Sequence, residues 1–215
     1  MIHDMRFDEE VKVTVGDGLV LSGHLKVPED AKAIIVFAHG SGSSRHSPRN
    51  NYVAEVLHKE NFATLLIDLL SEEENQERSK RFDIDLLADR LNDVRSWIDK
   101  NPHLEALMVG LFGASTGAAA ALKTVAKVNN RVAAIVSRGG RPDMASEVLD
   151  QIRVPVKLIV GGNDTEVLRL NQQAYDQLET TKDLQIIEGA SHLFEEAGKL
   201  EEVADSAVEW FLKHA

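Results

Sequence analysis

The chain has 215 residues, 43% hydrophobic and 27% charged, which is typical of a globular protein, and we expect residues 1–215 to form one domain. The net charge of -11 repels polyanions and disfavours nucleic acid or an anionic membrane as a partner. Cysteine is absent, which excludes disulfides, thiolate metal sites and a cysteine nucleophile.

We expect the N-terminal segment to be neither a signal sequence nor a membrane span. Residues 1–10 contain no apolar stretch, and the longest apolar runs of the chain are too short to cross a bilayer. We therefore expect a cytoplasmic protein. Residues 10–15 alternate apolar and polar, Gly16-Asp17-Gly18 is a turn signal, and residues 19–27 resume extended character, which predicts an antiparallel hairpin.

Beyond the hairpin, apolar runs alternate with stretches of helical periodicity. Buried strands are predicted at 33–38, 62–67, 107–112, 132–136, 156–160 and 184–187. Helices are predicted around 52–57, 83–100, 118–128, 144–152, 167–178 and 200–211. The charged segment 71–81 has no apolar periodicity, so we expect a solvated loop, and a second loop at 137–142. This alternation predicts an α/β fold: a mostly parallel sheet with helices on both faces.

The pentapeptide Gly113-Ala114-Ser115-Thr116-Gly117 lies between a predicted strand and a predicted helix. This context is typical of a nucleophile elbow, in which a serine occupies a strained turn and the flanking glycines let strand and helix approach closely. The alternative is a helix N-terminus with Ser or Thr as its cap. The order of the candidate partners favours the catalytic interpretation.

A serine nucleophile needs a histidine as base and a carboxylate that orients the histidine. Asp164 and His192 follow Ser115 in the order found in α/β-hydrolases, and each lies just after a predicted strand, where sites form in parallel sheets. Asp164 could instead cap the next helix, and Glu166 and Asp143 are rival acids. A lone loop histidine is more often an ordinary surface residue, and only its position makes His192 a candidate base.

An oxyanion intermediate needs two backbone donors. One is expected from Thr116, the residue after the nucleophile, and the other from Ser41, in the loop that follows the strand 33–38. We interpret His39 as a structural residue buried under that loop rather than as a second base.

Several arginines lie in these strand-exit loops. Arg45, Arg49, Arg138 and Arg141, with His46, could form a cationic rim that binds a carboxylate or phosphate of the substrate. The alternative is that they pair with local acids such as Asp143 and stabilise loops.

Four motifs occur in the order found in α/β-hydrolases: His39-Gly40-Ser41-Gly42, the pentapeptide around Ser115, Gly161-Gly162-Asn163-Asp164, and 189–194. The chain resembles this superfamily over nearly its whole length, and more narrowly the dienelactone hydrolase-like group. Residues 39–50 and 137–143 are similar to a bacterial subgroup in which some members are joined to a phosphoribosyltransferase domain. Dienelactone hydrolase proper uses a cysteine nucleophile where this chain has Ser115, so we do not expect dienelactone itself to be the substrate.

The predicted function is that of a serine hydrolase acting on small soluble carboxylic esters. Many members of the superfamily insert a lid between the strands ending near Val136 and beginning near Val156, but here that interval is only about twenty residues, which predicts a shallow open site. Thioester hydrolysis is an alternative within the same chemistry, and a non-catalytic binding protein is an alternative outside it. No motif supports a metal or nucleotide cofactor. A homodimer is one expectation for the assembly.

Overall fold

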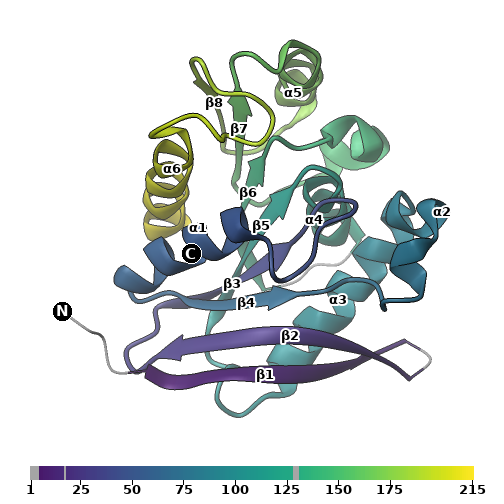
Figure 1. Cartoon of the computed structure of the whole chain (residues 1–215), viewed down its shortest axis with the longest axis vertical. Helices are drawn as coiled ribbons and strands as arrows, with labels where there is room; N and C mark the ends of the chain where they lie inside the picture. The colour runs from purple at the N-terminus through teal and green to yellow at the C-terminus, as the bar shows by residue number, and fades with distance from the viewer. Residues whose placement is uncertain (1–4, 17, 128–130) are drawn as a thin grey trace.

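The computed structural model describes residues 5–16, 18–127 and 131–215, whose core is an eight-stranded sheet in the order β1-β2-β4-β3-β5-β6-β7-β8 (Figure 1). The strands are β1 (Met5–Val15), β2 (Leu19–Pro28), β3 (Ala33–Ala38), β4 (Ala63–Ile67), β5 (Met108–Ala114), β6 (Val132–Arg138), β7 (Val156–Gly161) and β8 (Lys182–Ile187). β2 pairs antiparallel with β1 and with β4, and the other neighbours are parallel. This arrangement confirms the predicted α/β-hydrolase fold.

Helices cover both faces of the sheet. The helices are α1 (Pro48–Lys59), η1 (Glu74–Gln76), α2 (Arg78–Arg81), α3 (Ile84–Lys100), α4 (Thr116–Lys127), η2 (Pro142–Gln151), α5 (Thr165–Gln177) and α6 (Lys199–His214). Helices α1 and α6 pack together on one face, and α3, α4, η2 and α5 form the layer on the other (Figure 1).

The central strand β3 shows why its sequence is continuously apolar. Ile34 and Val36 belong to the hydrophobic cluster under α3 and α4, whereas Ile35 and Phe37 belong to the cluster under α1 and α6. Successive side chains of a strand point to opposite faces, so a strand covered on both sides needs apolar residues at every position.

Most predicted elements are present within a few residues of their expected bounds, with local differences at their ends. β1 begins at Met5, earlier than expected, and β6 continues through Arg138, which was assigned to a loop. The expected turn includes Asp17, and the helix predicted at 118–128 was expected to end at Val128; both residues lie outside the described part of the chain.

The solvated loop predicted at 71–81 contains no buried residue, but the prediction of a loop was wrong, because this segment contains η1 and α2. Its structure depends on a distant partner: Arg90 of α3 donates through Nη2 to Glu74 Oε1 at 2.7 Å and through Nη1 to the carbonyl of Leu69 at 2.9 Å. Ser71 adds a local bond, from its amide to Glu74 Oε2 at 3.1 Å. Because Glu74 and Arg90 are sixteen residues apart, their pairing produces no periodic pattern within 71–81 from which helical turns could be predicted.

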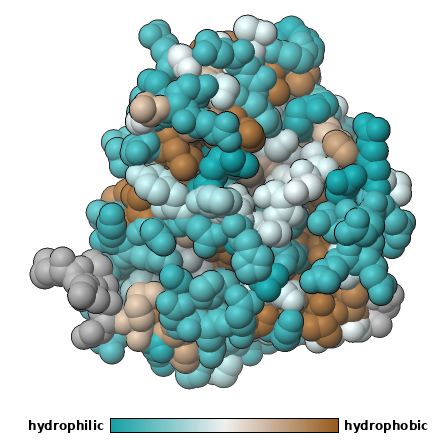
Figure 2. All heavy atoms as spheres, in the orientation of Figure 1, coloured by the Kyte–Doolittle hydropathy of each residue, from teal (hydrophilic) through white to brown (hydrophobic). Residues whose placement is uncertain are grey.

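Hydrophilic residues dominate the face seen in Figure 2, and hydrophobic ones appear there in small separate areas. Within the described residues, none of the helices combines the length and the apolar character that crossing a bilayer requires.

The Arg90–Glu74 pair predicts a pH-dependent contribution to stability. Hydrogen bonding to Arg90 lowers the pKa of Glu74 from 4.5 to about 2. The stabilisation is therefore complete above the unfolded-state pKa and is lost as the pH falls from 4.5 to about 2. We expect Glu74→Gln to lower the free energy of unfolding by about 1–2 kcal/mol at pH 7 in urea denaturation, and by less at pH 3.

Glu77→Gln is the matched control, because Glu77 is more exposed and, among the described residues, its one ion pair is with Lys80, three residues away. It should change the free energy of unfolding by no more than about 0.5 kcal/mol. An equal loss for Glu74→Gln at pH 7 and pH 3 would contradict this account.

Candidate active site

Ser115 lies at the turn between β5 and α4, with a backbone φ of 52°. This left-handed conformation is unfavourable for a residue with a side chain, so the surroundings must hold it. The Ser115 amide donates to the carbonyl of Arg138 at 3.2 Å, and the Ser115 carbonyl accepts from the amides of Ala118 and Arg141, each at 3.1 Å. These three backbone bonds hold the nucleophile candidate between β6, α4 and η2.

The two glycines of the pentapeptide allow the approach of neighbouring backbone. A Cβ atom at Gly113 would lie 2.4 Å from the Cα of Ala118, and one at Gly117 would lie 2.1 Å from the carbonyl oxygen of Ala38. Both distances are far below van der Waals contact. The backbone therefore makes the tight strand-to-helix turn that the Gly-x-Ser-x-Gly pattern predicts.

Asp164 and His192 are hydrogen bonded, with 2.6 Å between Asp164 Oδ2 and His192 Nδ1. Asp164 occupies the N-cap position of α5, but its side chain makes no capping bond. The rival carboxylates have other partners, since Glu166 pairs with Arg169 at 2.8 Å and Asp143 pairs with Arg141. Of the three candidate acids, Asp164 is the one that contacts His192.

Close approach of two loops brings this pair together. A Cβ atom at Gly161 would lie 2.4 Å from the carbonyl oxygen of Ala190. Asn163, two residues after Gly161, donates its amide to that same carbonyl at 2.9 Å and its side-chain Nδ2 to the carbonyl of Gly189 at 3.0 Å. The exits of β7 and β8 are thus fastened to each other, which sets the distance between Asp164 and His192.

Ser115 and His192 line a single cavity of about 200 Å³ at the carboxyl ends of the parallel strands. The loop after β3 contributes Ser41 and Ser43 to its wall, and the first turn of α1 contributes Ser47, Arg49 and Asn50. Arg138, from the end of β6, completes the polar part of the lining. The topology has therefore brought together side chains from four strand exits.

The loop after β3 is held by His39 and Thr116. The Ser41 amide donates to Thr116 Oγ1 at 2.9 Å, which joins the two segments expected to supply the oxyanion donors. His39 is buried, lies 3.0 Å from the carbonyl of Gly40 through Nδ1, and accepts from the Leu69 amide through Nε2 at 3.3 Å. Burial lowers its pKa, so His39 is neutral at pH 7 and buttresses the loop.

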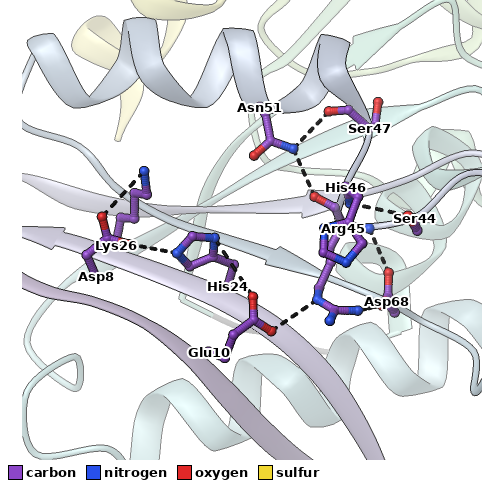
Figure 3. A network of polar contacts seen from close by, with 10 residues as sticks. All are labelled: Asp8, Glu10, His24, Lys26, Ser44, Arg45, His46, Ser47, Asn51 and Asp68. Atoms are coloured by element: carbon purple, nitrogen blue, oxygen red, sulfur yellow. Dashed lines mark hydrogen bonds and ion pairs between the residues drawn. The ribbon is translucent and has the colours of Figure 1, made fainter.

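The candidate arginines have different environments. The Arg45 guanidinium lies between Asp68 and Glu10, outside the cavity of Ser115, and the Arg45 amide donates to Asp68 Oδ1 at 2.6 Å (Figure 3). Arg141 binds Asp143 through two hydrogen bonds of 2.8 Å.

Arg138, in contrast, lines the cavity, is only 6% exposed, and donates to Asn50 Oδ1 at 3.3 Å. Asn50 was not singled out in the sequence, because an asparagine in the first turn of a helix carries no pattern that points to a site.

Metal binding can be assessed for residues 5–16, 18–127 and 131–215. Within these ranges, no group of three or more histidine, aspartate or glutamate side chains has an arrangement that could hold a metal ion.

Comparison with known proteins places this arrangement in a family. Residues 31–213 match the model of the alpha/beta hydrolase domain. The chain belongs to the α/β-hydrolase family. A solved structure named dienelactone hydrolase, from Anabaena variabilis ATCC 29413, is 51% identical, has a TM-score of 0.94, and is matched over 99% of both chains. This relative places the α/β-hydrolase in the dienelactone hydrolase-like group.

Other relatives differ from this α/β-hydrolase in length or in sequence. Two Mycobacterium tuberculosis proteins, provisionally named phosphoribosyl transferases, are 54% identical over 96% of this chain, which spans 46% of their length. Est1E from Butyrivibrio proteoclasticus is only 15% identical but has a TM-score of 0.81, with 95% of this chain and 98% of that chain covered. A likeness at that identity shows the shared fold alone.

The fastening of the β7 and β8 exits can be tested with neighbouring glycines. Gly161→Ala must push Ala190 away, and we expect at least a tenfold loss of hydrolytic activity together with a lower melting temperature, because His192 lies two residues beyond Ala190. Gly162→Ala is the matched control, since its Cβ would lie 3.4 Å from the nearest atom. Thermal unfolding and ester hydrolysis of both variants provide the measurement. Equal losses of activity and melting temperature in the two variants would contradict a special role for the close contact at Gly161.

Proposed function

We propose that this α/β-hydrolase is a serine hydrolase that cleaves small carboxylic esters through an acyl-enzyme. The observation that carries the proposal is the shared cavity of Ser115 and His192, with His192 hydrogen bonded to Asp164 at 2.6 Å. The family and the 51% identical relative named dienelactone hydrolase support ester hydrolysis in general. The assignment of the three side chains to a catalytic triad is our own.

In the proposed reaction, Ser115 Oγ attacks the carbonyl carbon while His192 takes the hydroxyl proton through Nε2. The Asp164 carboxylate accepts the Nδ1 hydrogen bond, which selects the tautomer whose Nε2 is free and stabilises the imidazolium. His192 then gives the proton to the departing alkoxide. In the second half of the reaction, His192 takes a proton from a water molecule, which attacks the carbonyl carbon of the acyl-enzyme. His192 then returns the proton to Ser115 Oγ as the acid leaves.

The amides of Thr116 and Ser41 are the proposed oxyanion donors. Thr116 directly follows the nucleophile, and Ser41 lines the same cavity as Ser115. Because the Ser41 amide donates to Thr116 Oγ1 in the free protein, binding of the oxyanion has to share or replace that bond. The Thr116 hydroxyl would thus hold the loop near its reactive position before substrate arrives.

The dimensions of the site favour small substrates. The cavity measures about 200 Å³, and the connection between β6 and β7 contains only η2, with no lid domain. Small acyl esters fit this space better than long-chain lipids, and thioesters of similar size remain an alternative within the same chemistry. The cytoplasmic location and the homodimer stay predictions.

A second candidate is a non-catalytic protein that binds a small ligand in the same cavity. Phosphoribosyl transfer is not proposed, because the mycobacterial relatives with that name extend well beyond the matched region, and the matched region here is an α/β-hydrolase domain. The hydrogen bond between Asp164 and His192 beside Ser115 favours the enzyme over the binder.

Active-site labelling separates these candidates. We expect a neutral fluorophosphonate ester to label the wild-type protein and not Ser115→Ala, because only an activated serine attacks this phosphorus. The wild type should also hydrolyse p-nitrophenyl acetate faster than the palmitate. Absence of wild-type labelling would overturn the proposed function and favour the binder.

The role of Asp164 predicts a large effect of a small change. Asp164→Asn keeps the size of the side chain but removes the carboxylate that orients His192, and we expect kcat for p-nitrophenyl acetate to fall roughly 10³- to 10⁴-fold. Glu166→Gln is the matched control, because Glu166 is exposed and pairs with Arg169, and its kcat should stay within about twofold. Comparable losses in both variants would refute the assignment of the acid.

A further inference from the structure

The cavity of Ser115 contains a buried positive charge that the described residues do not neutralise. Arg138 is 6% exposed, and no carboxylate of the described residues lies within 4 Å of its guanidinium. Its Nε atom is buried without a hydrogen-bond partner, and its bond to Asn50 Oδ1 is long, at 3.3 Å. Burial of an ion normally requires a partner that compensates the lost hydration.

A second guanidinium adds to the same positive potential. Arg49 lines the cavity beside Arg138, and its Nε is also buried without a partner. Its Nη1 lies 3.4 Å from Glu195, a carboxylate that is 65% exposed and therefore well screened by water. Burial and repulsion by Arg49 lower the pKa of Arg138 to about 10, so that Arg138 is still charged at pH 7.

The first turn of α1 contributes further donors and no acid. Ser47 is the N-cap of this twelve-residue helix, and Ser47, Arg49 and Asn50 all face the cavity. The first turn contains no acidic residue. A helix N-terminus carries a partial positive charge, which favours an anion at this position although the Asn50 amide already donates to Ser47 Oγ.

Interactions within the protein compensate only in part for the hydration that the Arg138 guanidinium loses on burial. The guanidinium lies over the Phe194 ring at 5.9 Å, which stabilises the charge but gives the buried Nε donor no hydrogen-bond partner. The charges of Arg45 and Arg141, in contrast, are each neutralised by an ion pair with a carboxylate. Among the described residues Arg138 has no such carboxylate, and it lines a cavity in which a ligand could supply one.

We propose that Arg138, together with Arg49 and the first turn of α1, forms a subsite for an oxyanion group of the substrate, a carboxylate or a phosphate. The inference rests on the proposed function, because the subsite lies in the cavity of Ser115 and selects which esters reach it. A guanidinium binds two oxygens of such a group in parallel, which orients the substrate as well as attracting it. The substrate class is therefore a small ester that carries a negative charge near the scissile bond.

Protection from active-site labelling tests the subsite without knowledge of the natural substrate. At constant ionic strength, succinate and inorganic phosphate should slow the labelling of Ser115 by a neutral fluorophosphonate, whereas chloride should not. Arg138→Gln and Arg49→Gln should weaken this protection roughly 10- to 100-fold in anion concentration, the usual cost of removing one charged hydrogen-bond donor. Arg49→Gln serves as the second variant because Arg49 is less buried than Arg138 and its replacement disturbs the core less.

Arg169→Gln is the matched control, since Arg169 is an exposed arginine on α5 that pairs with Glu166. It should retain full protection. Stronger protection by succinate identifies a carboxylate subsite, and stronger protection by phosphate identifies a phosphate subsite. Labelling that neither anion slows, or protection that is unchanged in both Arg138→Gln and Arg49→Gln, overturns the subsite while leaving the proposed function intact.

Hydrolysis provides a second, independent readout. Monomethyl succinate and dimethyl succinate differ in one negative charge, and release of acid from both can be followed by titration at constant pH. We expect Arg138→Gln to raise KM roughly 10- to 100-fold for the monoester and at most about threefold for the diester. Equal changes in KM for the two esters would overturn the subsite, and a wild type that fluorophosphonate does not label would overturn the proposed function instead.

Discussion

Ser115 adopts its left-handed backbone because β5, α4 and the exit of β3 meet at distances that leave no room for side chains at Gly113 and Gly117. The rest of the site depends on this contact. It aligns the start of α4 with the exit of β3, where the Ser41 amide reaches Thr116 Oγ1, and it ties the Ser115 amide to the carbonyl of Arg138. The nucleophile candidate, the proposed oxyanion donors and the buried arginine are therefore positioned by one set of backbone contacts.

The other half of the site is held in a similar way but by different groups. The exits of β7 and β8 approach until only glycine fits at position 161, and Asn163 fastens them through two hydrogen bonds. Parallel strands place their carboxyl ends at one edge of the sheet, so that the two halves face each other across a single cavity. Rigid backbone contacts hold the side-chain geometry before substrate binds, which is the condition for electrostatic stabilisation of a transition state.

The charge of the site is opposite to the charge of the whole molecule. The chain carries a net charge of -11, yet the described residues that line the candidate active-site cavity include two arginines and no acidic residue. Most basic side chains nearby are neutralised, as Arg45 is by Asp68 (Figure 3). A local positive potential inside an acidic protein attracts small anions while the outer surface repels large ones, which is consistent with a small charged substrate.

Much of the fold could be predicted from the amino-acid sequence, because buried strands and amphipathic helices leave a local periodic signal. Segment 71–81 could not, since its helical turns depend on the pairing of Glu74 with Arg90 on another helix. In the site, too, only features with a local sequence pattern could be predicted. The glycine pattern around Ser115 marks the elbow, because backbone strain restricts the residues allowed at each position of the turn.

By itself, the sequence determined the succession of strands and helices along the chain, the elbow around Ser115, and the placement of Asp164 and His192 directly after strands. Only the tertiary structure decided among the rival acids, because Asp164, Asp143 and Glu166 differ in their partners and not in their chemistry. The tertiary structure also showed that Arg45 and Arg141 each have a carboxylate partner, whereas Arg138 has none among the described residues. Whether a guanidinium is neutralised depends on which carboxylates the fold brings within a few ångströms, and that distance is set by contacts between segments far apart in the chain.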